Sequence, residues 1–168
     1  MYRDNKDEKF PIVDENGNII GFSTRGECHS GSMLLHPVVH LHVFNSKGEL
    51  YMQKRPEWKD IQPGMWDTSV GGHIDIGENM EAALLRESCE ELGITDFTPI
   101  SMGHYVFQSK RERELVYVNR TIYDGKIRPD NEELNGGRFW TADEIADNLG
   151  KNIFTPNFEN EYKKFFVK

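Results

Sequence analysis

Three carboxylates near the middle of the chain have the spacing of a metal site. Glu87, Glu90 and Glu91 recur at i, i+3 and i+4, so in a helix all three lie on one face. Like charges this close repel, and helix stability gains nothing from them. Mg²⁺ takes oxygen ligands and favours one or two carboxylates together with substrate phosphates. The spacing therefore predicts either a divalent-metal site for a phosphate substrate or a solvated acidic helix face.

The residues around these glutamates favour the metal site. Gly71 and Gly72 precede the predicted helix, and Glu78 follows Gly77. The whole segment resembles the signature of the Nudix hydrolase superfamily, in which a glycine, a glutamate, an Arg-Glu pair, two adjacent glutamates and a Gly-apolar pair recur at fixed spacing. The matching positions are Gly72, Glu78, Arg86, Glu87, Glu90, Glu91, Gly93 and Ile94. Ser88 departs from the pattern, because the family usually has an aliphatic residue there.

This resemblance implies a fold and a chemistry. The fold is the Nudix α/β/α sandwich, an α/β (α+β) architecture in which helices flank a mixed sheet. The reaction is attack of water on a diphosphate linked to another group. Mg²⁺, or Mn²⁺ in its place, would be held by Glu87, Glu90 and Glu91, with the Gly71 carbonyl as a further ligand. The base is one of these glutamates or a carboxylate from a loop, and the resemblance leaves the choice open.

Arg86 and Glu78 have a supporting role in the same resemblance. Arg86 would pair with Glu78 across the turn and orient the motif loop. The alternative for Arg86 is an exposed side chain in an ordinary surface ion pair. We include both residues among the candidate catalytic residues.

A second resemblance, over about residues 29–77, is to the isopentenyl diphosphate isomerases and their hydrolase-like relatives. The shared landmarks are His29, His36, Phe44, Asn45, Gly48, Lys54, Arg55, Lys59, Pro63, Gly64, Trp66, Gly72 and His73. In the isomerases three matching histidines and a pair of glutamates bind a metal. The resemblance therefore implies a second ligand set, which consists of His29, His36, His73, Glu112 and Glu114.

Gly71 separates the hydrolase from the isomerase. The isomerases need a cysteine two residues before the third histidine for proton transfer at carbon, and that position here is Gly71, which has no acid or base. Cys28, beside His29, is the one substitute that the sequence offers. The nearly intact motif and this glycine both favour hydrolysis over isomerisation. A third reading is a non-catalytic ligand sensor, although sensors of this superfamily usually lose the metal glutamates.

Other basic and aromatic residues have two readings each. His36, His40 and His42 alternate along one predicted strand and so share a face, which suits a metal or phosphate site or a half-exposed surface. As metal ligands, we rank His40, His42 and His104 below His29, His36 and His73. Lys54, Arg55 and Lys59 are candidate diphosphate contacts, with surface solvation as the alternative. Trp58, Trp66 and Trp140 would stack on a base or pack in the core.

Composition limits the function classes. The chain has 168 residues and a net charge of -8, which disfavours general binding to nucleic acid or an anionic membrane. We expect no membrane span and no secretion signal, because no apolar run is long enough. Cys28 and Cys89 are the two cysteines, and Cys89 falls inside the predicted helix, so we expect no disulfide and a cytoplasmic location. The expected partner is a small diphosphate molecule, and homodimers are common in the superfamily.

The elements that must position these residues form one expected domain, 1–168, with an N-terminal hairpin extension over about 1–33. Alternating and β-branched segments predict strands at 10–13, 19–23, 37–45, 49–55, 66–70, 97–108, 114–123 and a short one ending at Trp140. Helices are expected from the Asn79 cap to about Leu92, from the Thr141 cap to about Leu149, and over 157–167. Residues 1–33 and 109–113 are expected to set specificity, and neither contains a code for the group attached to the diphosphate.

Overall fold

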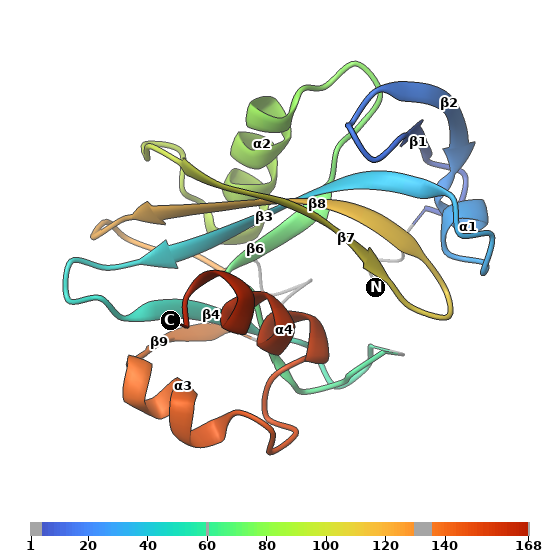
Figure 1. Cartoon of the computed structure of the whole chain (residues 1–168). Helices are drawn as coiled ribbons and strands as arrows, with labels where there is room; N and C mark the ends of the chain where they lie inside the picture. Colours follow the sequence, from blue (N-terminus) through green and yellow to red (C-terminus); the bar gives the residue numbers. More distant parts are fainter. Residues whose placement is uncertain (1–4, 60, 130–135, 168) are drawn as a thin grey trace.

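The computed structural model describes residues 5–59, 61–129 and 136–167, which form a three-layer sandwich (Figure 1). A seven-stranded mixed sheet is the middle layer, and a separate two-stranded sheet lies at the N-terminal end. The strands are β1 (Lys9–Val13), β2 (Ile19–Thr24), β3 (Leu35–Phe44), β4 (Leu50–Lys54), β5 (Trp66–Asp67), β6 (Val70–His73), β7 (Ile100–Gln108), β8 (Arg113–Ile122) and β9 (Gly137–Trp140). The helices are α1 (Arg25–Cys28), α2 (Met80–Leu92), α3 (Ala142–Asn148) and α4 (Pro156–Phe165). The predicted α/β/α sandwich is confirmed.

Strand β3 is the centre of the large sheet and aligns most of the candidate site. It runs parallel to β8, in a register that places His36 beside Glu114. It also pairs antiparallel with β6, in a register that places His40 opposite Gly71 and Val38 opposite His73. Three separate segments of the sequence therefore meet around one end of β3.

The helices cover opposite faces of the sheet. Helix α2 lies on one face, and α3 and α4 lie on the other (Figure 1). The core under α2 contains Leu84 and Leu92 of the helix and Leu41 of β3, all fully buried. The core under α3 and α4 is largely aromatic and includes Trp140, Phe154, Phe158 and Tyr162. Among the described residues, no helix is long and apolar enough to cross a membrane.

Helix α2 begins and ends as its sequence predicts. The Asn79 side chain accepts a hydrogen bond from the Ala82 N–H, which satisfies a donor that the helix leaves free at its first turn. Gly93 ends the helix in the left-handed conformation at φ 67°, where a residue without a side chain is unstrained. Ser88 is fully buried on the side that faces the sheet. The two caps fix which turn of α2 carries Glu87, Glu90 and Glu91.

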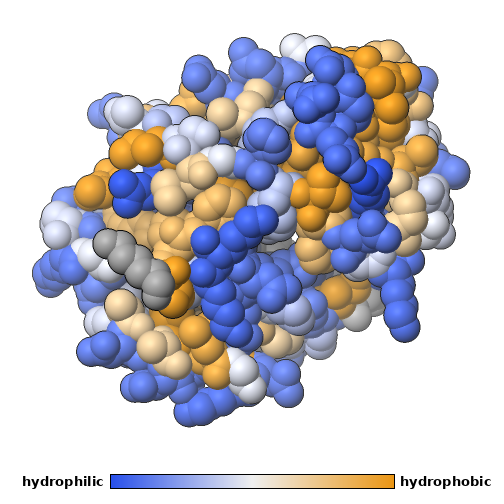
Figure 2. Space-filling view, in the orientation of Figure 1, coloured by the Kyte–Doolittle hydropathy of each residue, from blue (hydrophilic) through white to orange (hydrophobic). Residues whose placement is uncertain are grey.

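The N-terminal hairpin packs against the start of β3 through its buried side. Phe10 and Ile12 of β1 form a small core with Cys28. On the other side of the hairpin, Ile19, Ile20 and Phe22 of β2 are 60%, 68% and 59% exposed. They contribute to the apolar surface that Figure 2 shows at the upper right, over this hairpin.

Several local expectations differ from the structure. The predicted strand 66–70 is two strands, because Thr68 and Ser69 interrupt it, and β6 continues to His73. The strand expected from residue 97 begins at Ile100, and the last helix begins at Pro156, one residue earlier than expected, and ends at Phe165. Helix α1, at Arg25–Cys28, was not expected, because a single turn capped by Thr24 has no periodicity to detect. Strand β3 starts at Leu35, before Pro37, because it pairs with β8 from Leu35, which lies opposite Arg113.

Candidate functional site

Most of the candidate residues line one cavity of about 390 Å³ at the end of β3, between α2 and the hairpin that joins β7 to β8, whereas His36, Lys54 and Glu78 do not line it. The predicted site residues that line it are His29, Arg55, Lys59, Gly71, Gly72, His73, Arg86, Glu87, Glu90, Glu91, Glu112 and Glu114. The cavity also receives His40 and Gln53 from the sheet and Asn157 from α4. The two ligand sets implied by the two resemblances therefore share one space.

Arg86 holds the motif loop. Its Nε donates to Glu78 Oε2 at 2.7 Å and its Nη2 donates to Glu78 Oε1 at 2.9 Å, a two-point pair across the turn. Nη2 also donates to the His73 carbonyl at 2.9 Å, and Nη1 donates to Glu87 Oε1 at 2.9 Å. The hydrogen bonds with Glu78 are the largest cause that raises the pKa of Arg86. The expected Arg86–Glu78 pair is present, and it fixes both the loop and one motif carboxylate.

The three motif glutamates have different environments. Glu91 is 6% exposed, and its two oxygens accept hydrogen bonds from the Gly71 N–H at 3.1 Å and from Gln53 Nε2 at 3.3 Å. Arg86 Nη1 donates to Glu87 Oε1 at 2.9 Å and, at the longer distance of 3.4 Å, to Glu90 Oε2, and the Glu90 side chain is 57% exposed. Gly72 makes room for Glu87, because a Cβ at residue 72 would collide with that carboxyl group. The helix thus presents one buried carboxylate, Glu91, and two carboxylates that contact Arg86, of which Glu90 is the more exposed.

The histidines and Glu112 and Glu114 form the tighter ligand group. Among the described residues, the groups of three or more ligand atoms within 4.8 Å of one another are His29, His36 and His73, and His36, Glu112 and Glu114. The three motif glutamates do not form such a group. Glu112 Oε2 lies 3.0 Å from His29 Nε2 and 3.8 Å from His36 Nε2. The histidine set that the second resemblance implies is therefore assembled in the fold.

The protonation state of this group suits a cation. His36 Nδ1 donates to the Leu34 carbonyl at 3.0 Å, which leaves a lone pair on Nε2. Nε2 of His36 and Nε2 of His73 are buried, and neither has a hydrogen-bond partner within the described part of the chain. Burial lowers the pKa of both histidines, which favours the neutral imidazole that a metal ligand needs. Burial, and then the neighbouring Glu112, raises the pKa of Glu114 to about 8. Orphaned imidazole nitrogens beside crowded carboxylates fit a divalent metal.

Residue 71, where the isomerases have their proton-donating cysteine, has no proton donor in this protein. Gly71 lines the cavity at the position where the isomerases carry cysteine. Cys28, the substitute that the sequence offered, is fully buried with Phe10 and Ile12 and does not line the cavity. Burial raises the pKa of the Cys28 thiol to about 11, which makes it a poor acid or base at neutral pH. Cys28 is therefore ruled out as the replacement.

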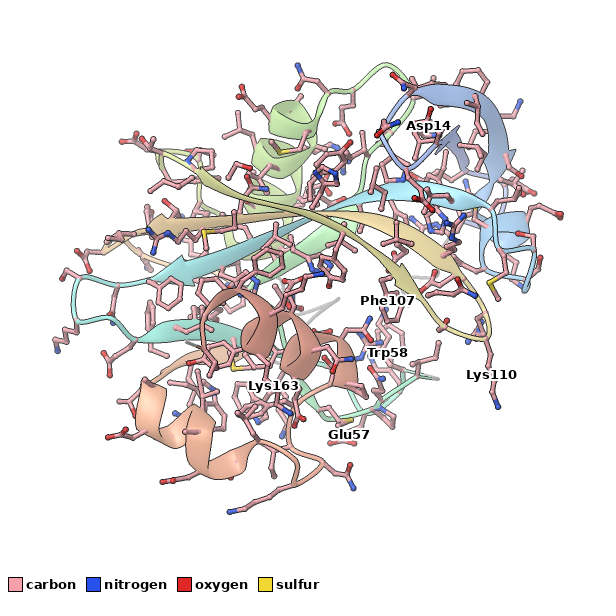
Figure 3. All side chains as sticks on the ribbon, viewed as in Figure 1. Asp14, Glu57, Trp58, Phe107, Lys110 and Lys163 are labelled. Carbon is pink, nitrogen blue, oxygen red and sulfur yellow. The ribbon has the colours of Figure 1, made fainter. Side chains whose placement is uncertain are left out.

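The predicted cations divide into two groups. Arg55 and Lys59 line the cavity, but Lys54 does not, and its ammonium lies over the Trp66 ring, 5.9 Å from the centroid. Trp66 and Trp140 pack against each other in the core, whereas Trp58 is 48% exposed on the loop after β4 (Figure 3). His104 lies on β7 against Tyr117 and does not line the cavity.

Three charged residues of the cavity were not predicted, and besides Asp67 of β5 two of them come from the N-terminal segment. Arg25 and Glu8 come from the N-terminal segment, pair at 2.7 Å, and both line the cavity. Arg25 also lies over the Phe10 ring, which in turn stacks on His73 with ring centroids 4.2 Å apart. No motif marks these residues, because their place depends on how the hairpin folds back on β3.

Comparisons with known proteins agree with this architecture. The NUDIX domain family model matches residues 34–158. An isopentenyl-diphosphate delta-isomerase of Streptomyces avermitilis is 30% identical over 153 residues, which cover 88% of this chain and 78% of that protein. An uncharacterised Nudix hydrolase of Pseudomonas aeruginosa is 33% identical over 127 residues, which cover 76% of this chain and 75% of that protein.

Solved structures give the same fold. A crystal structure of a Deinococcus radiodurans protein aligns with a TM-score of 0.81 at 21% identity, covering 95% of this chain and 99% of that one. A MutT protein of Methanosarcina mazei aligns with a TM-score of 0.66 at 22% identity, covering 78% of this chain and 92% of that one. The NUDIX family model matches most of this chain, and the three motif glutamates line one cavity. The chain therefore belongs to the Nudix family.

Proposed function

We propose that this protein is a divalent-metal-dependent hydrolase that cleaves a diphosphate linked to a polar organic group such as a nucleoside. One observation carries the proposal: Glu87, Glu90, Glu91, Glu112 and Glu114 line a single cavity in which Gly71 supplies no proton donor. Carboxylates in such number suit metal-assisted attack of water on a phosphate. Proton transfer at carbon would need an acid or base at residue 71.

The lining of the cavity supports a polar substrate. Among the described residues, Val38 and Pro56 are the only lining residues with an apolar side chain, glycines aside. A site for a hydrocarbon group would instead be walled mainly by apolar and aromatic side chains. A five-carbon isoprenoid chain would therefore gain little from burial here, whereas a sugar or nucleoside would find hydrogen-bond partners.

We assign separate roles to the residues of the cavity. Glu87, Glu90 and Glu91, with the Gly71 carbonyl, would hold Mg²⁺, and the set of His29, His36, His73, Glu112 and Glu114 suits a cation that accepts imidazole, such as Mn²⁺. A cation bound at either set supplies charge neutralisation to the phosphate oxygens. Arg55 and Lys59 would hold the outer phosphate, and Arg86 would keep Glu87 aimed at the cavity.

The runner-up function is isopentenyl diphosphate isomerisation. It is favoured by the assembled group of His29, His36, His73, Glu112 and Glu114 and by the similarity to the Streptomyces avermitilis isomerase. Gly71, the buried Cys28 and the polar lining all count against it. A non-catalytic sensor is disfavoured because all three motif glutamates are present.

A ³¹P NMR time course with Mg²⁺ or Mn²⁺ tests these functions. The panel contains a nucleoside diphosphate, ADP-ribose and isopentenyl diphosphate. We expect new monophosphate signals from a polar substrate, and Glu90→Gln should remove them while the protein stays folded. An intact diphosphate together with a new allylic diphosphate would establish the isomerase and overturn the proposal. If Glu90→Gln turned over at the wild-type rate, the metal assignment would be wrong.

A further inference from the structure

Neutral hydrogen-bonding residues line the cavity where helix α4 meets β5, and neither ligand set uses them. They are Asn157 of α4 and Thr68, which directly follows β5. Thr68 is 4% exposed, and among the described residues neither its hydroxyl nor the Asn157 amide has a hydrogen-bond partner. A buried hydroxyl without a partner costs free energy, and a bound molecule that supplies the missing hydrogen bond removes that cost.

The start of α4 is fixed against β5, and this contact sets the position of Asn157. The Thr155 N–H donates to the Trp66 carbonyl at 2.9 Å, and the Thr155 hydroxyl donates to Asp67 Oδ1 at 3.0 Å. The same hydroxyl accepts the Phe158 N–H at 3.2 Å, which is the N-cap contact that begins the helix. Thr155 is fully buried. Asn157 follows in the first turn of α4, so it is held at the cavity by elements other than the motif helix.

These neutral groups adjoin a cation that would hold phosphate. Arg55 Nη1 lies 3.5 Å from Asp67 Oδ2, whereas Asp67 Oδ1 accepts the Thr155 hydroxyl and, at 2.8 Å, the Thr68 N–H. The protein thus engages both oxygens of Asp67 and leaves the Asn157 amide and the Thr68 hydroxyl for a ligand. A phosphate bound by Arg55 would have its attached group beside these neutral groups.

We infer that Asn157 and Thr68 bind the group attached to the diphosphate, and that Asn157 selects a group with neutral hydrogen-bonding atoms, such as the hydroxyls of a sugar. This inference rests on the proposed function and narrows its substrate class. A carboxamide and a hydroxyl can each donate and accept, so they match sugar hydroxyls in either direction of the hydrogen bond. A hydrocarbon group would cover the amide and the hydroxyl without replacing the hydrogen bonds that water makes with them.

The variants are Asn157→Leu, Thr68→Val and, as the matched control, Asn160→Leu. Leucine removes the amide at similar size and favours a helix more than asparagine does, so α4 should still form. Valine replaces the Thr68 hydroxyl with a methyl group, which costs the fold little because this hydroxyl has no partner within the described part of the chain. Asn160 is exposed on the same helix and does not line the cavity.

Isothermal titration calorimetry with Mg²⁺ and two probes separates the attached group from the phosphates. The probes are α,β-methylene-ADP and methylenediphosphonate, which is the same diphosphate analogue without the nucleoside. We expect the full-length wild type to bind α,β-methylene-ADP at least about tenfold more tightly than methylenediphosphonate. Asn157→Leu should weaken binding of α,β-methylene-ADP about tenfold and Thr68→Val about threefold, each through the loss of one hydrogen bond. All three variants should bind methylenediphosphonate as the wild type does, and Asn160→Leu should also bind α,β-methylene-ADP normally.

The possible failures separate this inference from the proposed function. If Asn157→Leu lost affinity for both probes equally, or for neither, the inference would be overturned and the proposed function would stand. A wild type that bound the two probes equally well would also overturn it, because the nucleoside would then make no net contact. If Thr68→Val alone bound both probes normally, Thr68 would be removed from the assignment. If the wild type bound neither probe with Mg²⁺, the proposed function would fall as well.

Discussion

At the scale of single residues, Arg86 connects the motif loop to helix α2, which carries the candidate metal ligands. A planar guanidinium makes the two-point pair with Glu78 and still reaches Glu87 and the His73 carbonyl. A lysine ammonium has no such fork and can satisfy only part of this set. We expect Arg86→Lys to weaken metal affinity or turnover by about 10–100-fold, the usual effect of losing a group that orients metal ligands. Metal titration followed by calorimetry, together with kcat, measures it.

The control for this prediction is Arg120→Lys, because Arg120 is exposed on β8. It should change neither quantity. An Arg86→Lys protein with wild-type metal affinity and wild-type kcat would show that the clamp is an ordinary ion pair, which was the alternative reading of this arginine.

His40 also predicts how stability depends on pH. Its folded-state pKa of about 9 lies above the ordinary value of 6.5, so the protonated form is favoured by folding. The stabilisation is fully present below pH 6.5 and is lost as pH rises from 6.5 through about 9. We expect the free energy of unfolding, measured with urea across this range, to fall more steeply in the wild type than in His40→Asn. Parallel curves for the two proteins would contradict the predicted coupling.

At the scale of elements, the strand β6 must pass close under helix α2. A Cβ at residue 72 would collide with the Glu87 carboxyl group, and the collision would displace either the strand or the ligand. We expect Gly72→Ala to lower metal affinity and kcat by at least about tenfold, comparable with the loss of a group that supports a ligand. The matched control is Gly21→Ala on β2, where an added Cβ meets nothing within 4 Å. Equal losses in the two variants would show that the effect is general destabilisation.

Elements also show what the sequence could and could not predict. Helix α2 was predictable because its caps, Asn79 and Gly93, and its motif are local signals. The pairing of His40 with Glu161 was not, because the residues are 121 positions apart and only the docking of α4 brings them together. The position of Arg25 in the cavity was not predictable for the same reason. The group of His36, Glu112 and Glu114 was reached through a resemblance, and the parallel register of β3 and β8 supplies its physical basis.

At the scale of the whole molecule, the net charge is -8. Part of this excess lies in the cavity, where carboxylates outnumber lysines and arginines. Mutual repulsion in this cavity opposes folding until cations enter. The candidate ligands come from the N-terminal segment, the central strand, the motif helix and the β7–β8 hairpin, so metals bound by them would link parts of the fold that are distant in sequence. Metal affinity is therefore coupled to global stability.

This coupling predicts different effects for two metals. Imidazole ligands suit Mn²⁺ more than Mg²⁺, whereas an all-carboxylate set accepts Mg²⁺. At a concentration of 100 times its dissociation constant, a metal that binds only the folded state adds about 2.7 kcal/mol. We expect Mn²⁺ to raise Tm more than Mg²⁺ does, and we expect His73→Phe, which keeps the ring that stacks on Phe10, to remove most of the difference. Glu90→Gln is the counterpart that should instead reduce the response to Mg²⁺. If His73→Phe kept the full Mn²⁺ response in thermal unfolding, the histidine group would not be a metal site, and the orphaned nitrogens of His36 and His73 would need another partner.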